Sequence, residues 1–372
     1  MPRVLDRADS TVYRDPAAYT SHPCVARLAN GDLLVAFNES LPRQPRLHPP
    51  SDPRFINLMC RSHDGGTRWL PPRAVPDYGA TGAECPSIRQ LDSGDILLVQ
   101  WRFAWFPLET ARKLAARPDT TLQFVLPSPR SWLGRRPTCD ADWDTCELPW
   151  ARADAGLFIS VSGDNGATWD RTSAVSTAPF ARGYSPRPPC QLADGVVLLA
   201  LDSHDERGVL YVLRSSDRGQ SWQAPLVVSD SPPLAEPTIL GLPSGKVVIL
   251  SRDEKTGVVH QHDSLDGGLT WLPPRQTPLW GYPAHLLRLS DGRLFAIYGV
   301  RRAPFGVRAC LSGDDGASWD AAGELVIRDD MPNGNVGYPT AVELPDGSLL
   351  AAYYGEDADG VTHIIGSRFR LP

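Results

Sequence analysis

The sequence lacks any long apolar run. Its longest uninterrupted apolar stretches span about five residues, far short of the roughly 20 that a transmembrane helix needs. The opening residues, MPRVLDRADSTVYRD, contain no apolar core of a secretion signal, which predicts a cytoplasmic protein. The 37 Lys and Arg residues are outnumbered by 43 Asp and Glu, giving a net charge of −6, which disfavours nucleic acid as a partner. We therefore expect a protein that binds neither membranes nor nucleic acid.

The sequence also lacks a disulfide framework and the common cofactor motifs. Seven cysteines, an odd number spread over 372 residues, favour reduced thiols. The one close pair, Cys139 and Cys146, matches no zinc spacing, and the acidic stretch Asp140–Asp144 matches no EF-hand loop. No nucleotide-binding glycine fingerprint, P-loop, nucleophile elbow or His-Glu-x-x-His motif occurs. We therefore expect no metal and no cofactor.

What the sequence does contain is turns and repeats. The 36 prolines and 32 glycines make it turn-rich without reaching the proportion typical of disorder. The pattern Ser-x-Asp-x-Gly-x-x-Trp, which we call an Asp box, occurs five times: Ser62–Trp69, Ser162–Trp169, Ser215–Trp222, Ser264–Trp271 and Ser312–Trp319. Its Asp can accept hydrogen bonds from the N–H groups of the turn, and its Trp can pack between neighbouring sheets. These features predict a structural role for the Asp boxes.

A second repeat alternates with the Asp boxes and marks six β-hairpins. Each copy has an apolar stretch, a short polar turn ending in glycine and another apolar run, as in VARLANGDLLVAF; the turn glycines are Gly31, Gly94, Gly195, Gly245, Gly292 and Gly347. Asn-Gly, Ser-Gly and Asp-Gly suit tight hairpin turns. One period of the two repeats holds about four antiparallel strands, which is the unit of a β-propeller blade.

The repeats predict an all-β fold, a six-bladed β-propeller with four antiparallel strands per blade, formed as a single domain by residues 1–372. The sixth hairpin has no Asp box, and only one further strand, Thr362–Phe369, follows it. Its missing outer partner is expected at the N-terminus, in Ser10–Arg14. Pairing the two ends closes the ring and removes an exposed edge strand.

Two insertions interrupt the repeat. Residues 41–55 lengthen the first blade, and residues 103–150 lengthen the second with a short helix, Leu108–Ala116, in Pro-, Arg- and Trp-rich coil. Both fall between the second and third strands of a blade, so both are expected on the face where the innermost strands begin. The Asp boxes then lie on the opposite face. Because long loops in a compact domain are usually functional, the face with the insertions is the predicted active-site face.

Polar and aromatic residues flank the inner strands on that face. The residues near the start of a first strand or the end of a second strand include His22, Glu39, Glu84, Arg102, Arg187, Asp202, His204, Glu236, Arg252, Asp253, His285, Arg301, Arg302, Tyr338 and Tyr354. Because a propeller brings these positions to one axis, they predict a polar ligand site at the mouth of the channel. Arginines alternating with carboxylates could equally form paired structural networks, so that alternative stays open for each residue.

Five Asp boxes on a six-bladed pattern resemble the sialidase (neuraminidase) superfamily, and the resemblance covers the chain outside residues 103–150. Sialidases carry a Glu before the inner strand of a middle blade and an Arg sixteen residues later, a spacing that Glu236 and Arg252 match. The nucleophilic Tyr of the family starts the inner strand of the last blade, where this chain has Tyr338. The acid/base Asp of the family lies in the first blade's insertion, where Asp52 is the one Asp.

The chain departs from the family at the arginine triad that binds the substrate carboxylate. His22 stands where sialidases begin the first blade with an Arg, and Arg301, Arg302 and Arg308 compete for the place of the third arginine. A His can bind a carboxylate or a hydroxyl, but not in the bidentate manner of a guanidinium. The expected substrate is therefore sialic acid or a related but distinct acidic sugar.

The resemblance implies a retaining exo-glycosidase that acts on carbohydrate without a cofactor. A sialoside carries a carboxylate on its anomeric carbon, and a neutral phenol approaches it without meeting a like charge. Tyr338 would be the nucleophile, Glu236 its base and Asp52 the acid/base. The substrate would be bound by Arg252, Arg301, Arg302, His22, Glu84, Arg102, Arg187 and His285.

Two other functions are compatible with these residues. A propeller using His22, His285 and Tyr338 for proton transfer could be a uronate lyase or another glycosidase. A propeller could also bind carbohydrate or protein without catalysis. The pairing of Glu236 with Tyr338 favours an enzyme, because a binding protein needs no base beside a tyrosine. A lyase would be recognised by its unsaturated, ultraviolet-absorbing product.

Overall fold

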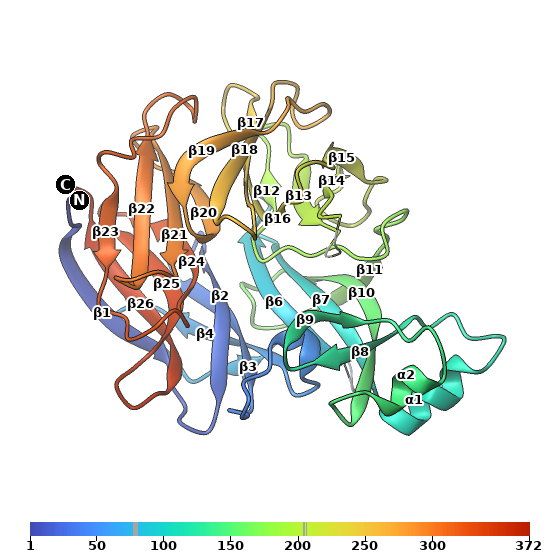
Figure 1. The fold of residues 1–372 in the computed structure, drawn as a ribbon. Helices are drawn as coiled ribbons and strands as arrows, with labels where there is room; N and C mark the ends of the chain where they lie inside the picture. The colour runs from blue at the N-terminus through green and yellow to red at the C-terminus, as the bar shows by residue number, and fades with distance from the viewer. Residues whose placement is uncertain (77–80, 204, 206) are drawn as a thin grey trace.

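A computed structural model of the chain describes residues 1–76, 81–203, 205 and 207–372. These residues form six antiparallel sheets arranged in a ring, which confirms the six-bladed β-propeller (Figure 1). His204, expected on the active-site face, lies outside the described residues. In the part of the chain that the structure covers, no helix is long and apolar enough to cross a membrane.

Four blades are built from consecutive strands that run outward from the central channel. The first contains β2 (Tyr19–Arg27), β3 (Leu33–Ser40), β4 (Ile56–Ser62) and β5 (Arg73–Ala74). The third contains β12 (Cys190–Gln191), β13 (Val197–Asp202), β14 (Leu210–Ser215) and β15 (Leu226–Ser229). The fourth contains β16 (Ala235–Gly241), β17 (Val247–Arg252), β18 (Val258–Ser264) and β19 (Arg275–Trp280). The fifth contains β20 (Tyr282–Arg288), β21 (Leu294–Val300), β22 (Gly306–Ser312) and β23 (Leu325–Arg328).

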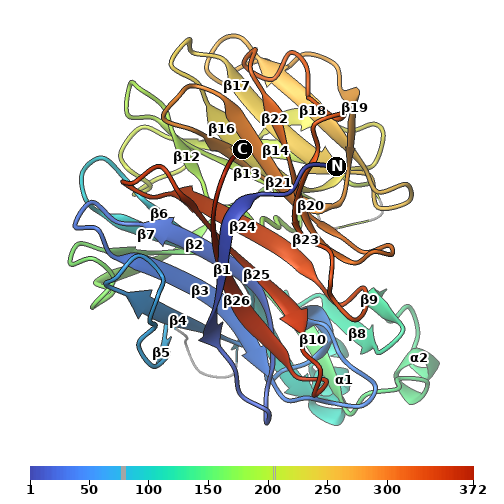
Figure 2. The same ribbon diagram turned by 90° about the vertical axis from the view of Figure 1, so that its left-hand side faces the viewer.

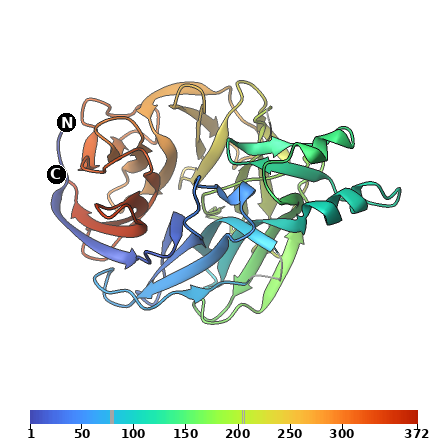
Figure 3. The same cartoon turned by 60° about the horizontal axis from the view of Figure 1, so that its bottom comes forward.

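The second blade is larger than predicted because the insertion adds strands to it. Its own strands are β6 (Thr81–Gln90), β7 (Ile96–Pro107), β10 (Trp150–Ser162) and β11 (Arg171–Val175). The insertion contains the predicted helix as α1 (Leu108–Ala115), a second short helix α2 (Ala141–Asp144) and a hairpin of β8 (Phe124–Ser128) and β9 (Ser131–Arg135). The hairpin forms where coil was expected, since Phe124 and Leu126 bury themselves with Ala111 and Trp143 in a small separate core. Figure 3 shows this insertion, in green, extending away from the ring.

The sixth blade joins the two ends of the chain, as the missing Asp box predicts. It consists of β24 (Gly337–Glu343), β25 (Leu349–Glu356), β26 (Thr362–Arg370) and, as its outer strand, β1 (Leu5–Tyr13). β1 and β26 are antiparallel, with Ser10 opposite Gly366. Figure 2 shows the two strands side by side with both termini near each other. The ring is closed by β1 and β26, which confirms the predicted pairing.

The second strand of each blade is buried on both faces, which explains its continuous apolar run. Every residue of Leu33–Phe37 and of Val247–Leu250 is completely buried. The clusters of buried residues span neighbouring blades, and Phe37 of the first blade packs with Ala352 and Ile364 of the sixth. The core therefore consists of seams between blades, and it fixes where each inner strand begins and ends at the channel.

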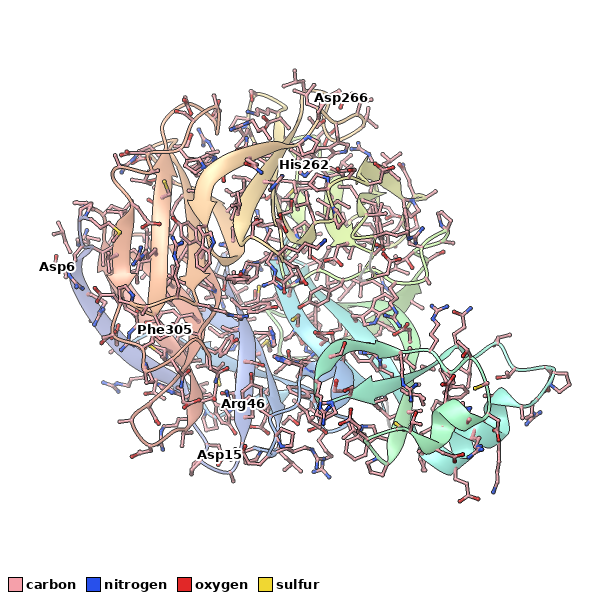
Figure 4. All side chains as sticks on the ribbon, viewed as in Figure 1. Asp6, Asp15, Arg46, His262, Asp266 and Phe305 are labelled. Carbon is pink, nitrogen blue, oxygen red and sulfur yellow. The ribbon has the colours of Figure 1, made fainter. Side chains whose placement is uncertain are left out.

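The Asp boxes form turns beside the hairpin turns, on the face opposite the first insertion. In the third blade, Asp217 Oδ1 accepts hydrogen bonds from the N–H groups of Gln220 (3.0 Å) and Ser221 (2.8 Å), as predicted. In the first blade, Gly66 has a φ of +88° and lies close to Leu350 of the sixth blade. A Cβ at position 66 would be 3.0 Å from the Leu350 side chain. Figure 4 places Asp266, from another Asp box, and Arg46, from the first insertion, at opposite ends of the molecule. The Asp boxes thus contact neighbouring blades and lie away from the polar ring.

Candidate functional site

Two cavities lie at the two ends of the inner strands. The insertion-side cavity, of about 160 Å³, is lined by His22, His48, Pro49, Pro50, Glu84, Tyr184, Ala235, Glu236, Arg252, Glu254, Arg301, Tyr338 and Tyr354. The turn-side cavity, of about 680 Å³, is lined by the other ends of the same strands and by the hairpin turn at Gly94. The insertion-side cavity is lined by most of those residues of the predicted polar ring that lie at either cavity. It is also lined by residues of the first insertion. This cavity is the candidate site.

A repeated backbone bend directs the side chains of this site. His22, Glu236 and Tyr338 each stand six residues before the leucine that opens their hairpin turn, and each precedes a proline. Their φ angles are +53°, +53° and +51°, in the left-handed region that non-glycine residues rarely adopt. The pairing register of all three inner strands shifts at this point. Such strain persists only where the surrounding structure enforces it, and it is concentrated at functional sites.

Tyr338, Glu236 and Arg252 form the centre of the site. The Tyr338 hydroxyl donates a short hydrogen bond to Glu236 Oε1. Arg252 Nε lies 2.8 Å from the other carboxylate oxygen, Glu236 Oε2. Arg252 also contacts Glu254 through Nη2 (2.7 Å), whereas its buried Nη1 has no hydrogen-bond partner among the described residues. The structure therefore brings together three of the residues that the family resemblance selected, and Arg252 keeps one guanidinium donor without a hydrogen-bond partner among the described residues.

Arg301 and aromatic rings surround this centre. Arg301 Nη2 donates to the Tyr354 hydroxyl (2.9 Å), and its guanidinium lies 5.7 Å from the Tyr338 ring centroid. The His22 ring meets Tyr338 edge to face, with centroids 4.1 Å apart. Three arginines were candidates for the third position of the triad, and among the described residues that line the cavity only Arg301 is present. Arg308 instead forms an ion pair with Glu324 (2.9 Å).

The protonation states favour neutral Tyr338 and neutral His22 beside positive arginines. Burial raises the pKa of Tyr338 well above its usual value, and the nearby Glu236 carboxylate raises it further. Burial lowers the pKa of His22 well below its usual value, and surrounding positive charge, Arg301 included, lowers it too. A neutral phenol of this kind attacks only if a base removes its proton as the new bond forms, and Glu236 is in place to do so.

Glu84 is a second buried carboxyl group in the same cavity. It is 5 % exposed, and its Oε2 has no hydrogen-bond partner among the described residues. Burial raises the pKa of Glu84 to about 8, although Arg152 opposes the shift. Glu84 therefore carries a proton at neutral pH, while Glu236 is paired with Arg252. One cavity thus holds two buried carboxyl groups in different environments, an arrangement typical of acid and base partners.

We expect Glu84→Gln to stabilise the protein at neutral and higher pH. Below pH 4.5 the Glu84 carboxyl is protonated in both the folded and the unfolded chain. As the pH rises towards 8, the unfolded chain ionises first, so the free energy of unfolding of the wild type falls. Glutamine removes this loss, which amounts to up to about 3 kcal/mol at pH 7. Urea unfolding at pH 5 and pH 8 measures it, and a stability difference that does not grow with pH would contradict the assignment.

Asp52 is not brought to the cavity. Its carboxylate is 1 % exposed and is held by Arg43 Nε (2.6 Å), Ser40 Oγ (3.2 Å) and the Arg54 N–H (3.0 Å). The neighbouring prolines, Pro49 and Pro50, line the cavity instead. The Asp52 carboxylate thus stabilises the first insertion through an ion pair and a hydrogen bond to the backbone of Arg54. The expectation that Asp52 lies beside Tyr338 is therefore wrong.

Four other expected site residues also lie outside the insertion-side cavity. Arg102 is buried and donates to Pro76 O (2.8 Å) and Gln100 Oε1 (2.7 Å). Arg302 is exposed, with its guanidinium 3.9 Å from the Trp280 ring centroid, whereas the adjacent Arg301 lines the cavity. Arg187 and His285 occupy the channel itself and are described next.

Arg187 lies beneath the site rather than in it. Its Nε and Nη2 donate to Ala284 O and Pro283 O, both at 2.8 Å, so it joins the third blade to the fifth. Its guanidinium is 5.8 Å from the Tyr338 ring centroid. His285 stands four rather than six residues before its turn leucine, Leu289, and therefore lines the turn-side cavity. The number of residues between each side chain and its turn leucine would have predicted that His285 and Tyr338 lie at opposite ends of the channel.

Three polar residues that line the candidate site were not predicted from the sequence: His48, Tyr184 and Glu254. His48 lies among the prolines of the first insertion, and no repeat fixes the path of that loop. Glu254 directly follows Arg252-Asp253 at the end of β17, where extending the polar ring by one position would have included it. Tyr184 precedes the short β12, and its hydroxyl lies 2.7 Å from Cys85 Sγ.

Comparisons with known proteins agree with the fold. A family model described as BNR repeat-like domain matches residues 143–351, more than half of the chain. Among solved structures, a Dyadobacter fermentans protein of unknown function aligns with a TM-score of 0.80 and 24 % identity over 98 % of both chains. A mutant NanB sialidase from Streptococcus pneumoniae aligns with a TM-score of 0.68 and 14 % identity, covering 100 % of this chain and 71 % of NanB.

A more distant relative gives the same architecture. Trypanosoma rangeli sialidase, in complex with the inhibitor DANA, aligns with a TM-score of 0.65 and 12 % identity over 98 % of this chain and 60 % of its own. No characterised protein sequence matches the chain. At these identities the structures show a shared fold. Together with the family match, they show that the chain belongs to the BNR repeat-like domain family and is a sialidase-like propeller.

Proposed function

We propose that the protein is a retaining exo-glycoside hydrolase that removes a terminal acidic sugar, sialic acid or a relative of it. The observation that carries this proposal is the hydrogen bond from the Tyr338 hydroxyl to a Glu236 carboxylate that also pairs with Arg252. A binding site does not need a base on a tyrosine, whereas a tyrosine nucleophile does. The cavity volume of about 160 Å³ suits one terminal unit rather than a length of polymer.

In the proposed reaction, Tyr338 attacks the anomeric carbon while Glu236 takes the phenolic proton. The bond to the leaving-group oxygen breaks, and that oxygen receives a proton from an acid. Water then attacks the glycosyl–tyrosine intermediate and gives a proton to the deprotonated acid, while the proton on Glu236 returns to the phenolate as it leaves. Two displacements at one carbon retain its configuration.

Arg252 and Arg301 are the proposed partners of the substrate's acidic group. Both line the cavity, and Arg252 Nη1 is a buried donor with no partner among the described residues. Neutral His22 replaces the third cation, so the site carries less positive charge than an arginine triad. This supports an acidic sugar whose carboxylate is held by two guanidinium groups and one neutral ring.

The proposed acid is Glu84 in place of Asp52. Glu84 lines the cavity and keeps its proton at neutral pH, whereas Asp52 is paired with Arg43 outside it. We expect Glu84→Gln to lower turnover about 100-fold on a sugar leaving group but much less on a nitrophenyl glycoside, which leaves without a proton. Asp52→Asn is the matched control and is expected to show no such dependence on the leaving group. A leaving-group dependence in Asp52→Asn alone would assign the acid to Asp52.

A substrate screen tests the proposed function. Chromogenic sialosides, uronides and neutral glycosides are incubated with the full chain, and NMR follows the configuration of the released sugar. Release of an acidic sugar with retained configuration is the expected result. An unsaturated product absorbing in the ultraviolet would identify a lyase, and absence of turnover on every class would favour a carbohydrate-binding propeller.

A further inference from the structure

The turn-side cavity is separate from the candidate site and four times larger. Its volume is about 680 Å³, and it opens on the face that carries the hairpin turns. Its walls come from the inner strands of all six blades, with apolar side chains such as Val25, Ile88 and Leu286 in the channel. None of the groups assigned to the proposed reaction lines it.

Three arginines surround this cavity without partners. Arg27, Arg89 and Arg288 all line it and are exposed, and none makes a side-chain hydrogen bond or ion pair within the described residues. Most arginines of this acidic chain are paired with a carboxylate; Arg293, for example, binds Asp291 at the adjacent turn (2.7 Å). The three guanidinium groups come from the first, second and fifth blades, and that of Arg288 is close enough to Asp291 to help lower the pKa of that carboxyl.

The interior of the cavity offers further donors. Arg89, from the second blade, lines the cavity together with Cys190 from the third and His285 from the fifth. His285 Nδ1 accepts a hydrogen bond from the Ala341 N–H (3.3 Å), which leaves the proton of the neutral ring on Nε2. The His285 ring and the Arg89 guanidinium both present N–H groups.

Two acidic side chains line the cavity, and one of them is occupied by hydrogen bonds. Glu343 lines the cavity, but its two oxygens accept hydrogen bonds from Ser290 N and Ser290 Oγ, both at 2.7 Å. Asp92 also lines the cavity, at its exposed rim. Counting Arg27, Arg89 and Arg288 against these two carboxylates leaves a net positive cavity in a protein of net charge −6.

From this arrangement we propose that the turn-side cavity binds a compact multivalent oxyanion, such as a phosphate or pyrophosphate group, through Arg89 with Arg27 and Arg288. Guanidinium groups match the geometry of such oxyanions and form paired, charge-assisted hydrogen bonds with them. A cavity of this volume also accepts an organic group attached to the anion. The proposal does not depend on the proposed function, because the two cavities have no assigned residue in common.

Titration calorimetry of the full chain with sodium pyrophosphate, at constant ionic strength, tests the proposal. We expect saturable binding of one pyrophosphate per chain, weakened at least about tenfold by Arg89→Gln and by the double variant Arg27→Gln/Arg288→Gln. Arg293→Gln is the matched control, because this arginine lies at the hairpin turn that follows Arg288 but is already paired with Asp291, and the variant is expected to bind normally. Parallel titrations with inorganic phosphate, sulfate and citrate rank the oxyanions that the cavity accepts.

A variant of the other cavity locates the bound anion. Arg301→Gln removes a positive charge from the insertion-side cavity and is expected to leave pyrophosphate binding unchanged. Absence of saturable binding, unchanged affinity in Arg89→Gln, or lost affinity in Arg301→Gln would each overturn the proposal. Circular dichroism and thermal melts of each variant confirm that a loss of binding does not come from unfolding; Arg89 is exposed, so its replacement is expected to fold.

Discussion

Tyr338→Phe is expected to lower turnover by about 10³-fold or more, since it removes the proposed nucleophile and leaves Glu236 without a proton to accept. The phenyl ring still fills the same space beside His22, so the fold is expected to survive. Steady-state kinetics on the best substrate from the screen measures the loss. Circular dichroism and the melting temperature show whether the variant remains folded.

Tyr354→Phe is the matched control for this variant. Tyr354 lines the same cavity and also contacts His22, but its hydroxyl accepts from Arg301 and is not bonded to a carboxylate. Removal of the Tyr354 hydroxyl is expected to raise KM, because Arg301 loses a hydrogen bond that positions it. The effect on kcat is expected to be smaller. Full turnover in Tyr338→Phe, or an equal collapse of kcat in both variants, would remove Tyr338 from the role of nucleophile.

Deleting residues 1–13 is expected to destabilise the propeller by about 4 kcal/mol or more. The deletion removes buried Val12 together with the hydrogen bonds between β1 and β26. It also exposes the edge of β26, which carries the apolar residues Ile364, Ile365 and Phe369 and becomes a site for aggregation. Urea unfolding and size-exclusion chromatography of the truncated chain measure both effects.

A synthetic peptide provides the control for the truncation. The peptide of residues 1–14 is expected to restore stability when added to the truncated chain, because it can pair with β26 in the original register. A scrambled peptide of the same composition is not expected to do so. A truncated chain as stable as the intact one would show that the seam between β1 and β26 contributes little to the closed ring.

Much of the fold could be predicted because the signals for it are local and repeated. A hairpin turn ending in glycine and an Asp turn bonded to its own backbone depend on neighbouring residues alone, so each blade carries its own signature. The sixth blade, without an Asp box, then required a strand from the other end of the chain, and β1 supplies it. The β8–β9 hairpin could not be predicted in this way, since it depends on packing against α1 and α2 within a single insertion.

The candidate site could be predicted only in part. Tyr338 and Glu236 occupy equivalent positions before a proline in their blades, so the repeat itself places them together. Arg301 and Arg302 are adjacent, and only the direction of the chain at the end of β21 decides which one enters the cavity. Asp52 belongs to a loop whose path no repeat predicts. Its carboxylate forms an ion pair with Arg43 and does not occupy the position that the family resemblance implied. Local pattern therefore identified Tyr338, Glu236 and Arg252, failed for Asp52 in the loop, and misplaced Arg102 and His285 although both lie on strands.

The pairing of β1 with β26 also affects the order in which the protein can be completed during synthesis. Ser10 and Gly366 are 356 positions apart, yet their backbones lie side by side. The ribosome releases β1 first, and this strand has no partner until nearly the whole chain has emerged. Five blades can assemble from consecutive segments during translation, whereas the last one has to wait. A nascent chain that stalls before residue 362 thus has an incomplete sixth blade, in which β1 and the outer edge of β25 have no partner strand. Chaperones and proteases can distinguish this form from the finished protein.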